Sequence, residues 1–182
     1  MTDTISPWVR RYAPLIPGGA VLDLACGSGR HSRHMASLGH AVVAVDRDPA
    51  ALAAAAGPDI STSAIDLEQE GAAWPFGPDR FAGIVVTNYL HRPLIADMLG
   101  SLAPNGVLIY ETFADGNAQF GKPSNPAFLL QPGELLEWAR SHGLRVVAFE
   151  DGVIDDPKAA MVQRVCAVKP DFPRVAALLP PF

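Results

Sequence analysis

The segment VLDLACGSGR, residues 21–30, places stricter limits on the fold than any other part of the sequence. Its first four residues are typical of a buried strand. The glycines at positions 27 and 29 permit backbone angles that a side chain would forbid. A helix that begins directly after them would point free N–H groups toward an anionic ligand group. A strand, a glycine turn and a helix in this order predict a nucleotide site at the end of the first strand of an α/β sheet.

Acidic residues occur in or at the end of the first three predicted strands. Asp23 lies inside the first strand, where an unpaired carboxylate is costly, so a cationic or donor-rich ligand group is its expected partner. S-adenosylmethionine carries an ammonium and a sulfonium and would supply such a group. Asp46 ends the apolar run 41–46, and its carboxylate can accept two hydrogen bonds from a ribose diol. Asp66 follows the third run in the same way.

A nicotinamide-dependent oxidoreductase is the competing interpretation of the glycine turn. The dinucleotide fingerprint is G-x-G-x-x-G or G-x-G-x-x-A, whereas residues 27–32 are GSGRHS, with serine at the third small position. Such an enzyme would also need a substrate domain, for which a chain of 182 residues has little room. Asp46 does not decide between the two ligands, because NAD has the same ribose diol.

With its three acids, the chain resembles the class I S-adenosylmethionine-dependent methyltransferases from residue 21 to about residue 168. The resemblance implies S-adenosylmethionine as cofactor and S-adenosylhomocysteine as product. It also implies that Asp46 binds the ribose, that Asp66 faces the adenine amino group and that the Leu67 N–H faces the ring. Ala25 stands where the family often has the first glycine of its loop. The cofactor-binding residues expected from this resemblance are Asp23, Ala25, Cys26, Gly27, Gly29, Asp46, Arg47, Asp66, Leu67 and Asn88.

Residues 88–93 and 110–126 resemble a bacterial branch of small methyltransferases related to the tellurite-resistance type, which implies a small acceptor but not tellurite itself. An in-line displacement at the activated sulfonium gains most from positioning, and a base is needed only for a protonated acceptor. Tyr89, His91 and Glu111 are the residues expected nearest the methyl group. His91 could instead be a surface residue at a helix start, and Glu111 could pair with a nearby lysine or arginine. A non-catalytic S-adenosylmethionine sensor or partner subunit remains the alternative function.

Alternating strands and helices predict an α/β fold, a Rossmann-like doubly wound sheet of seven strands. The resemblance implies five parallel strands followed by a hairpin that makes the last strand antiparallel. Strands are expected near 20–25, 41–46, 60–65, 81–87, 106–112, 144–150 and 161–168, and helices near 6–13, 30–38, 49–56, 93–101 and 132–142. The whole chain, 1–182, is expected to form one domain, with an N-terminal helix within 1–18, a substrate-side loop at 113–131 and an apolar tail at 170–182.

The loop after the fifth predicted strand is longer than an ordinary connection and contains several phenylalanines. Long loops in compact domains are often lids or binding loops. Phe113, Phe120 and Phe128 offer apolar surface, and Gly116 and Gly121 can absorb backbone rotation. We therefore expect residues 113–128 to close over the acceptor, the alternative being a surface loop held by its phenylalanines.

Composition excludes several classes of function. Hydrophobic residues make up 49% and charged residues 18%, which is typical of a globular protein, and the net charge of −5 argues against nucleic acid as a partner. Two cysteines indicate neither a disulfide scaffold nor a zinc site. His31 and His34 have helical spacing but no third ligand, so no metal is expected. Without a signal-peptide pattern or a membrane-length apolar run, the chain is expected to be a cytoplasmic monomer or homodimer.

Overall fold

The computed structural model describes residues 4–177, which form a seven-stranded sheet in the order β3-β2-β1-β4-β5-β7-β6. The first five strands are parallel, and β7 runs antiparallel to both β5 and β6. This arrangement confirms the expected fold class, including the antiparallel last strand. The strands are β1 Val21–Leu24, β2 Val42–Asp46, β3 Ile60–Ala64, β4 Phe81–Thr87, β5 Leu102–Phe113, β6 Arg145–Ile154 and β7 Ala160–Val168.

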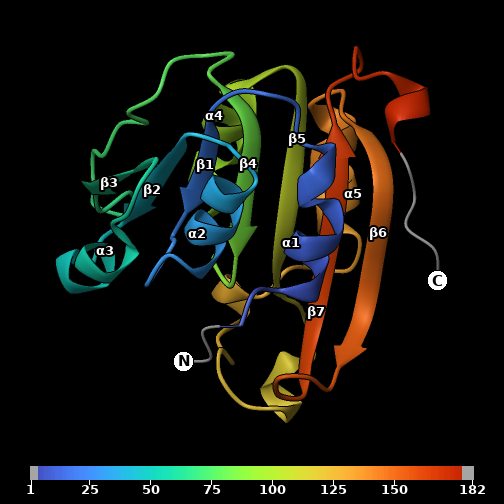
Figure 1. The fold of residues 1–182 in the computed structure, drawn as a ribbon. Coiled ribbons are helices and arrows are strands. Elements are labelled where there is room, and N and C mark those ends of the chain that lie inside the picture. Colours follow the sequence, from blue (N-terminus) through green and yellow to red (C-terminus); the bar gives the residue numbers. More distant parts are fainter. Residues whose placement is uncertain (1–3, 178–182) are drawn as a thin grey trace.

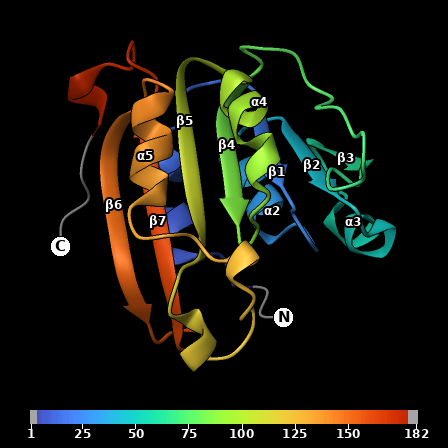
Figure 2. The ribbon, with the colours of Figure 1, turned by 180° about the vertical axis from the view of Figure 1, so that it is seen from behind.

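Helices cover both faces of the sheet. Helices α1, α2 and α3 lie on the face seen in Figure 1, and α4 and α5 lie on the face seen in Figure 2. The α-helices are α1 Pro7–Tyr12, α2 Arg30–Ser37, α3 Pro49–Ala55, α4 Ile95–Gly100 and α5 Glu134–Ser141. Short 3-10 turns are η1 Ala13–Leu15, η2 Arg92–Leu94, η3 Asn117–Gln119, η4 Pro126–Phe128 and η5 Arg174–Ala176.

Each face of the sheet contributes to its own apolar cluster. Leu22 and Leu24 of β1 belong to the cluster that includes residues of α4 and α5, whereas Val21 belongs to the cluster with Trp8 of α1 and Met35 of α2. Side chains alternate between the faces of a strand, and central parallel strands are buried on both faces. This double burial explains why the strands appear in the sequence as almost continuous apolar runs.

Several elements differ in length from the sequence-based expectation. Strand β5 begins at Leu102, which pairs with Phe81 before the register shifts, and not at residue 106. Gly106 permits this bend, because a Cβ there would lie 2.6 Å from the Ala103 carbonyl oxygen. Strand β6 extends to Ile154, which pairs with Ala160 across the hairpin. The sequence pattern ends earlier because these outer residues are half-buried or exposed and lack an apolar run.

The first part of the apolar tail after β7 packs on the domain. Phe172 is 5% exposed and packs in the cluster beneath α1. The rest of the predicted tail includes residues 178–182, which lie outside the described part of the chain. Within residues 4–177, no helix has the length and apolar character needed to cross a membrane.

Candidate functional site

A cavity of about 930 Å³ opens at the carboxyl ends of the parallel strands. Strand order reverses between β1 and β4, and ligands of open α/β sheets bind at such a switch point. The cavity has two sides, which we call the glycine-loop side and the hairpin side. The glycine-loop side includes residues 24–28, 45–48, 65–68, Asn88 and Tyr89. The hairpin side includes residues 4–7, Glu111, Phe113, Asn117, Phe120, Lys122, residues 156–160, Val162 and Arg164.

Asp46 holds the glycine loop in place. Its Oδ2 accepts a hydrogen bond of 2.8 Å from the Gly27 N–H, and its Oδ1 accepts one of 3.0 Å from the Asp48 N–H. Gly27 has a φ of +54°, and a Cβ placed on it would meet no protein atom within 4 Å. The loop backbone is therefore open to the cavity beside a preorganised carboxylate, a combination that fits a ribose and its flanking groups.

Eight of the ten predicted cofactor-binding residues line this cavity. The Asp66 carboxylate accepts a hydrogen bond of 3.0 Å from the Glu68 N–H, which stabilises the turn after β3. Asn88 adopts a φ of +56°, and its N–H donates to the Glu111 carbonyl oxygen at 2.9 Å. The eight residues are Ala25, Cys26, Gly27, Asp46, Arg47, Asp66, Leu67 and Asn88. Residues from four strand ends thus surround one space large enough for a nucleoside and a second ligand.

Gly29 does not line the cavity and has a packing role instead. It precedes α2 in a left-handed conformation with a φ of +78°. A Cβ on Gly29 would lie 2.5 Å from the Ala55 Cβ and 2.7 Å from the Ala55 Cα. The glycine pattern therefore serves two purposes, since Gly27 opens the loop to the ligand and Gly29 lets α2 and α3 approach each other.

Asp23 also lies away from the cavity lining, and its partner is not the expected ligand cation. The residue is 1% exposed, and its Oδ2 accepts a hydrogen bond of 2.5 Å from the Ser32 hydroxyl of α2. Burial raises the pKa of Asp23 to about 6, although the Ser32 hydrogen bonds oppose the shift. The structure thus corrects the sequence-based interpretation, because a helix serine satisfies the carboxyl group internally.

Asp23→Asn should change the free energy of unfolding differently at the two ends of the pH range. We expect this change to be more favourable at pH 8 than at pH 4 by roughly 2 kcal/mol. The folded-state pKa of about 6 lies above the unfolded value of 3.8. The native carboxyl group therefore stabilises the fold fully below about pH 4, and this contribution is lost as the pH rises through 6. Urea unfolding of both proteins at the two pH values measures the effect. An equal difference at pH 4 and pH 8 would contradict it.

The three predicted catalytic residues have different positions. Tyr89 and Glu111 line the cavity, whereas His91 does not. His91 lies in a neighbouring hollow with Trp74 and Asp97, so the expectation that it faces the cavity is wrong. Burial raises the pKa of Tyr89, and the nearby Glu68 carboxylate raises it further, which keeps the phenol neutral.

Glu111 is 8% exposed and is held by two partners. Its Oε1 accepts a hydrogen bond of 2.8 Å from the Ser6 hydroxyl, and its Oε2 lies 3.2 Å from Nη1 of Arg164. Arg164 also pairs with Glu150 at 2.5 Å. The alternative that Glu111 pairs with an arginine is therefore confirmed, at a position that still faces the cavity.

The N-terminal segment is a part of the site that the sequence did not reveal. Residues 4–7 line the cavity on the hairpin side, and Figure 1 shows the chain before α1 running along the end of the sheet where the strands stop. Besides its bond to Glu111, Ser6 donates its N–H to Nε2 of His31 at 3.2 Å. Ser6-Pro7 is a recognisable helix start, but its partners are 25 and 105 residues away in sequence.

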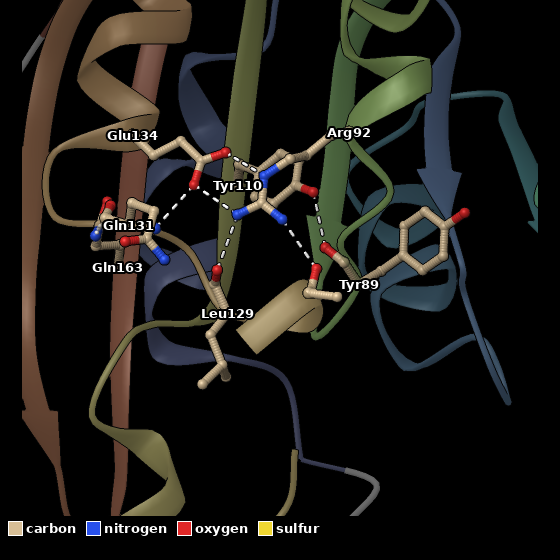
Figure 3. Close-up of polar contacts among 8 residues, drawn as sticks. Tyr89, Arg92, Tyr110, Leu129, Gln131, Glu134 and Gln163 are labelled. Atoms are coloured by element: carbon tan, nitrogen blue, oxygen red, sulfur yellow. Dashed lines mark hydrogen bonds and ion pairs between the residues drawn. The ribbon is translucent and has the colours of Figure 1, made fainter. Parts of the chain in front are cut away.

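Arg92, and not His91, connects this region to the loop after β5 (Figure 3). Its guanidinium donates to both carboxylate oxygens of Glu134, at 2.7 and 2.8 Å, and to the carbonyl oxygens of Ala127 and Leu129, each at 2.9 Å. A planar fork of donors suits this bidentate geometry. Arg92 therefore anchors the end of the loop, while its side chain stays 38% exposed.

Two further hydrogen bonds fasten the loop after β5 and the segment after β4 to neighbouring strands. Gln163 of β7 donates to the Gln131 carbonyl at 2.7 Å, and the Tyr110 hydroxyl donates to the Tyr89 carbonyl at 2.7 Å. Figure 3 shows the Tyr89 ring pointing away from the Arg92 cluster. The main chain of Tyr89 is thus fastened to β5, while its phenol belongs to the cavity.

The fold and the cavity define an α/β protein with a nucleotide site and room for a second ligand, and the comparisons specify its class. Residues 21–106 match the methyltransferase domain family. This match includes the glycine loop and the ends of β1 to β4, which line the glycine-loop side of the cavity. No curated protein sequence matches the chain.

Several solved structures share this fold. TehB from Haemophilus influenzae has a TM-score of 0.75 and 20% identity over 92% of this chain, which spans 63% of the TehB chain. An S-adenosylmethionine-dependent methyltransferase from Mesorhizobium loti has a TM-score of 0.71 and 19% identity, covering 90% of this chain and 96% of its own. The 1,6-didemethyltoxoflavin-N1-methyltransferase of Burkholderia thailandensis, with bound S-adenosylhomocysteine, has a TM-score of 0.65 and 24% identity, covering 89% and 76%.

Residues 21–106 therefore match the methyltransferase domain, and the chain shares its fold with S-adenosylmethionine-dependent methyltransferases of known structure. The domain match favours a methyltransferase over the nicotinamide-dependent alternative.

Proposed function

We propose that the protein transfers the methyl group of S-adenosylmethionine to a small-molecule acceptor bound on the hairpin side of the cavity. The observation that carries this proposal is the continuity of one cavity from the glycine loop to the β6–β7 hairpin. Both reactants can therefore occupy the same enclosure, with residues of the β4 and β5 ends between them. Proximity in a shared pocket is the main requirement for an in-line displacement.

The glycine-loop side has the donors and acceptors that this cofactor needs. Asp46 can accept the ribose hydroxyls, while Asp66 and the Leu67 N–H can hold the adenine, and Gly27 leaves open space beside the loop. S-adenosylmethionine supplies the activated methyl group and leaves as S-adenosylhomocysteine. The residues present fit the cofactor at each of these positions.

The hairpin side suits an acceptor of small size. Phe113, Phe120 and Val162 provide apolar contacts, while Lys122 and Lys158 contribute charged groups. The Burkholderia enzyme named above has 1,6-didemethyltoxoflavin bound together with S-adenosylhomocysteine. An enclosed site of similar fold supports a small acceptor for this chain as well.

The chain contributes mainly positioning and exclusion of water. Tyr89 supplies a neutral phenol that can donate a hydrogen bond, and Glu111 has its two oxygens engaged by Ser6 and Arg164. Glu111 is thus held in place as part of the cavity wall. A protonated acceptor would lose its proton to solvent or to the carboxylate of Glu111. An acceptor that is already deprotonated needs no base.

A panel of acceptors tests the proposed function. Thiols, metalloid oxyanions, phenols and carboxylates are incubated with S-adenosylmethionine, and release of S-adenosylhomocysteine is measured. We expect release with at least one of these small-molecule classes, and none with duplex DNA or structured RNA, because the net charge is −5. Tight binding of S-adenosylhomocysteine without turnover of any acceptor would favour the sensor or partner-subunit alternative.

The loop after β5 should influence turnover of the acceptor but not the affinity for the cofactor. Phe120 lines the cavity, whereas Phe128 is 46% exposed and lies outside its lining, so the predicted contribution of Phe128 to closure is not supported. We expect Phe120→Ala to reduce kcat/KM for the acceptor by about tenfold, with the affinity for S-adenosylhomocysteine nearly unchanged. Phe128→Ala is the matched control and should leave both values intact.

Hydrogen exchange gives the structural measurement for the same loop. Asn117 anchors the loop to the hairpin, because it is 1% exposed, accepts the Met161 N–H at 3.0 Å and donates to the Pro123 carbonyl at 2.9 Å. We expect residues 118–125 to gain protection when cofactor and acceptor are both bound. Equal protection with and without ligands, together with full activity of Phe120→Ala, would make this segment a surface connection.

A further inference from the structure

Thr87 lies where the two sides of the cavity meet. It is the last residue of β4, is 9% exposed and lines the cavity. The preceding residue, Val86, pairs with Leu24, the last residue of β1, so Thr87 lies beside the start of the glycine loop. Its Oγ1 is 3.3 Å from Nδ1 of His31, which is 2% exposed.

The contacts of His31 determine which of its nitrogens carries the proton. The Ser6 N–H donates to Nε2, so Nε2 must present a lone pair. A neutral imidazole with an unprotonated Nε2 carries its proton on Nδ1. Burial, together with the charges of Arg30 and His34, lowers the pKa of His31 to about 3, so the ring stays neutral at physiological pH. The Nδ1–H group therefore donates to the Thr87 hydroxyl oxygen.

This direction leaves the hydroxyl proton of Thr87 available. The oxygen accepts from His31, and the hydroxyl has no second hydrogen-bond partner among residues 4–177. A donor that lines a ligand cavity needs an acceptor atom on the ligand. At the amino-acid end of S-adenosylmethionine the ammonium can only donate, whereas the carboxylate can only accept. The nearby Glu111 already has both carboxylate oxygens engaged by Ser6 and Arg164.

We infer that the Thr87 hydroxyl binds the carboxylate at the amino-acid end of the cofactor, and that Ser6 and His31 position this hydroxyl as a donor. The inference rests on the cofactor of the proposed function. It gives Thr87 a direct binding role and makes His31 a positioning residue. It also connects the N-terminal segment to cofactor binding, since the Ser6 N–H sets the tautomer of His31.

Two ligands separate this role from a structural one. S-adenosylhomocysteine has the carboxylate, whereas 5′-methylthioadenosine has the same nucleoside without the amino-acid end. By calorimetry, Thr87→Val should weaken S-adenosylhomocysteine binding by about tenfold or more, as expected for a hydrogen bond to a charged group. Binding of 5′-methylthioadenosine should change less than about twofold. Thr87→Ser, which keeps the hydroxyl, should restore S-adenosylhomocysteine affinity.

Thr112→Val is the matched control. Thr112 is on the neighbouring strand, is 1% exposed and does not line the cavity, so the same substitution there should leave both affinities unchanged. The inference is overturned if Thr87→Val leaves S-adenosylhomocysteine binding intact, if it weakens both ligands equally, or if Thr87→Ser fails to restore binding. If the unmodified protein binds neither ligand, the cofactor assignment itself fails, and this outcome is distinct from the others.

The tautomer of His31 can be measured without any variant of Thr87. In ¹⁵N NMR spectra of the ligand-free protein, with His31→Asn used to assign the signal, Nδ1 should be protonated and Nε2 unprotonated from pH 5 to pH 8. Arg30, His34 and Thr87 face or flank this ring. A proton on Nε2 would overturn the inference even if the Thr87 variants did not fold.

Discussion

Asp46→Ala should weaken the binding of S-adenosylmethionine and S-adenosylhomocysteine by between about tenfold and more than a hundredfold. The variant leaves the ribose hydroxyls without a charged acceptor, a loss of about 1.5–3 kcal/mol in a dry site. It also removes the acceptor of the Gly27 N–H at 2.8 Å, so the glycine loop loses the contact that preorganises it. Both effects act in the same direction.

Calorimetry with S-adenosylhomocysteine measures this effect. Asp97→Ala on α4 is the control, because it removes a carboxylate that does not line the cavity and should leave the affinity unchanged. Unchanged affinity of Asp46→Ala would refute the ribose assignment. Binding of NADH in place of S-adenosylhomocysteine would refute the cofactor itself.

Gly29→Ala should reduce the free energy of unfolding by about 2–5 kcal/mol. The new Cβ would overlap the Cβ and Cα of Ala55, at 2.5 and 2.7 Å, and helix α3 would have to move to relieve the clash. The φ of +78° adds the cost of a left-handed conformation for a residue with a side chain. Denaturant unfolding measures the sum of the two effects.

Gly39→Ala separates the clash from the backbone strain. Gly39 has a φ of +90°, but a Cβ there would meet no atom within 4 Å, so only the conformational cost of about 1–2 kcal/mol is expected. If the two variants lose equal stability, the packing role assigned to Gly29 is incorrect. Gly27→Ala completes the series, because it has open space around it and should mainly reduce cofactor affinity.

The residues on the glycine-loop side of the cavity could be predicted because the sequence pattern that carries them is local. A buried strand, a glycine turn and an acid at the strand end are encoded within a few neighbouring residues, and parallel strands then bring their carboxyl ends to one edge. Asp46, Asp66 and Gly27 therefore line the cavity as expected. The packing role of Gly29 could not be predicted, because the residue that it packs against, Ala55, is 26 residues further along the chain.

The direction of side chains near the strand ends could not be predicted, because neighbouring residues in the chain point to different sides of the sheet. His91 was expected at the methyl group and points to a neighbouring hollow, while Arg92 anchors the loop through Glu134, 42 residues later. Asp23 shows the same limit, since β1 places it under α2, where Ser32 is its partner. These outcomes depend on the register and helix packing that tertiary contacts impose.

By itself, therefore, the sequence determined the fold class and most of the cofactor side, because periodic burial and glycine turns act over short distances. Only the tertiary structure decided how the hairpin side is built. Ser6, His31 and Glu111 come from three separate elements, and each looks ordinary in its own segment. Hydrogen bonds between residues 25 and 105 positions apart form only after the sheet has assembled, and no local pattern records them.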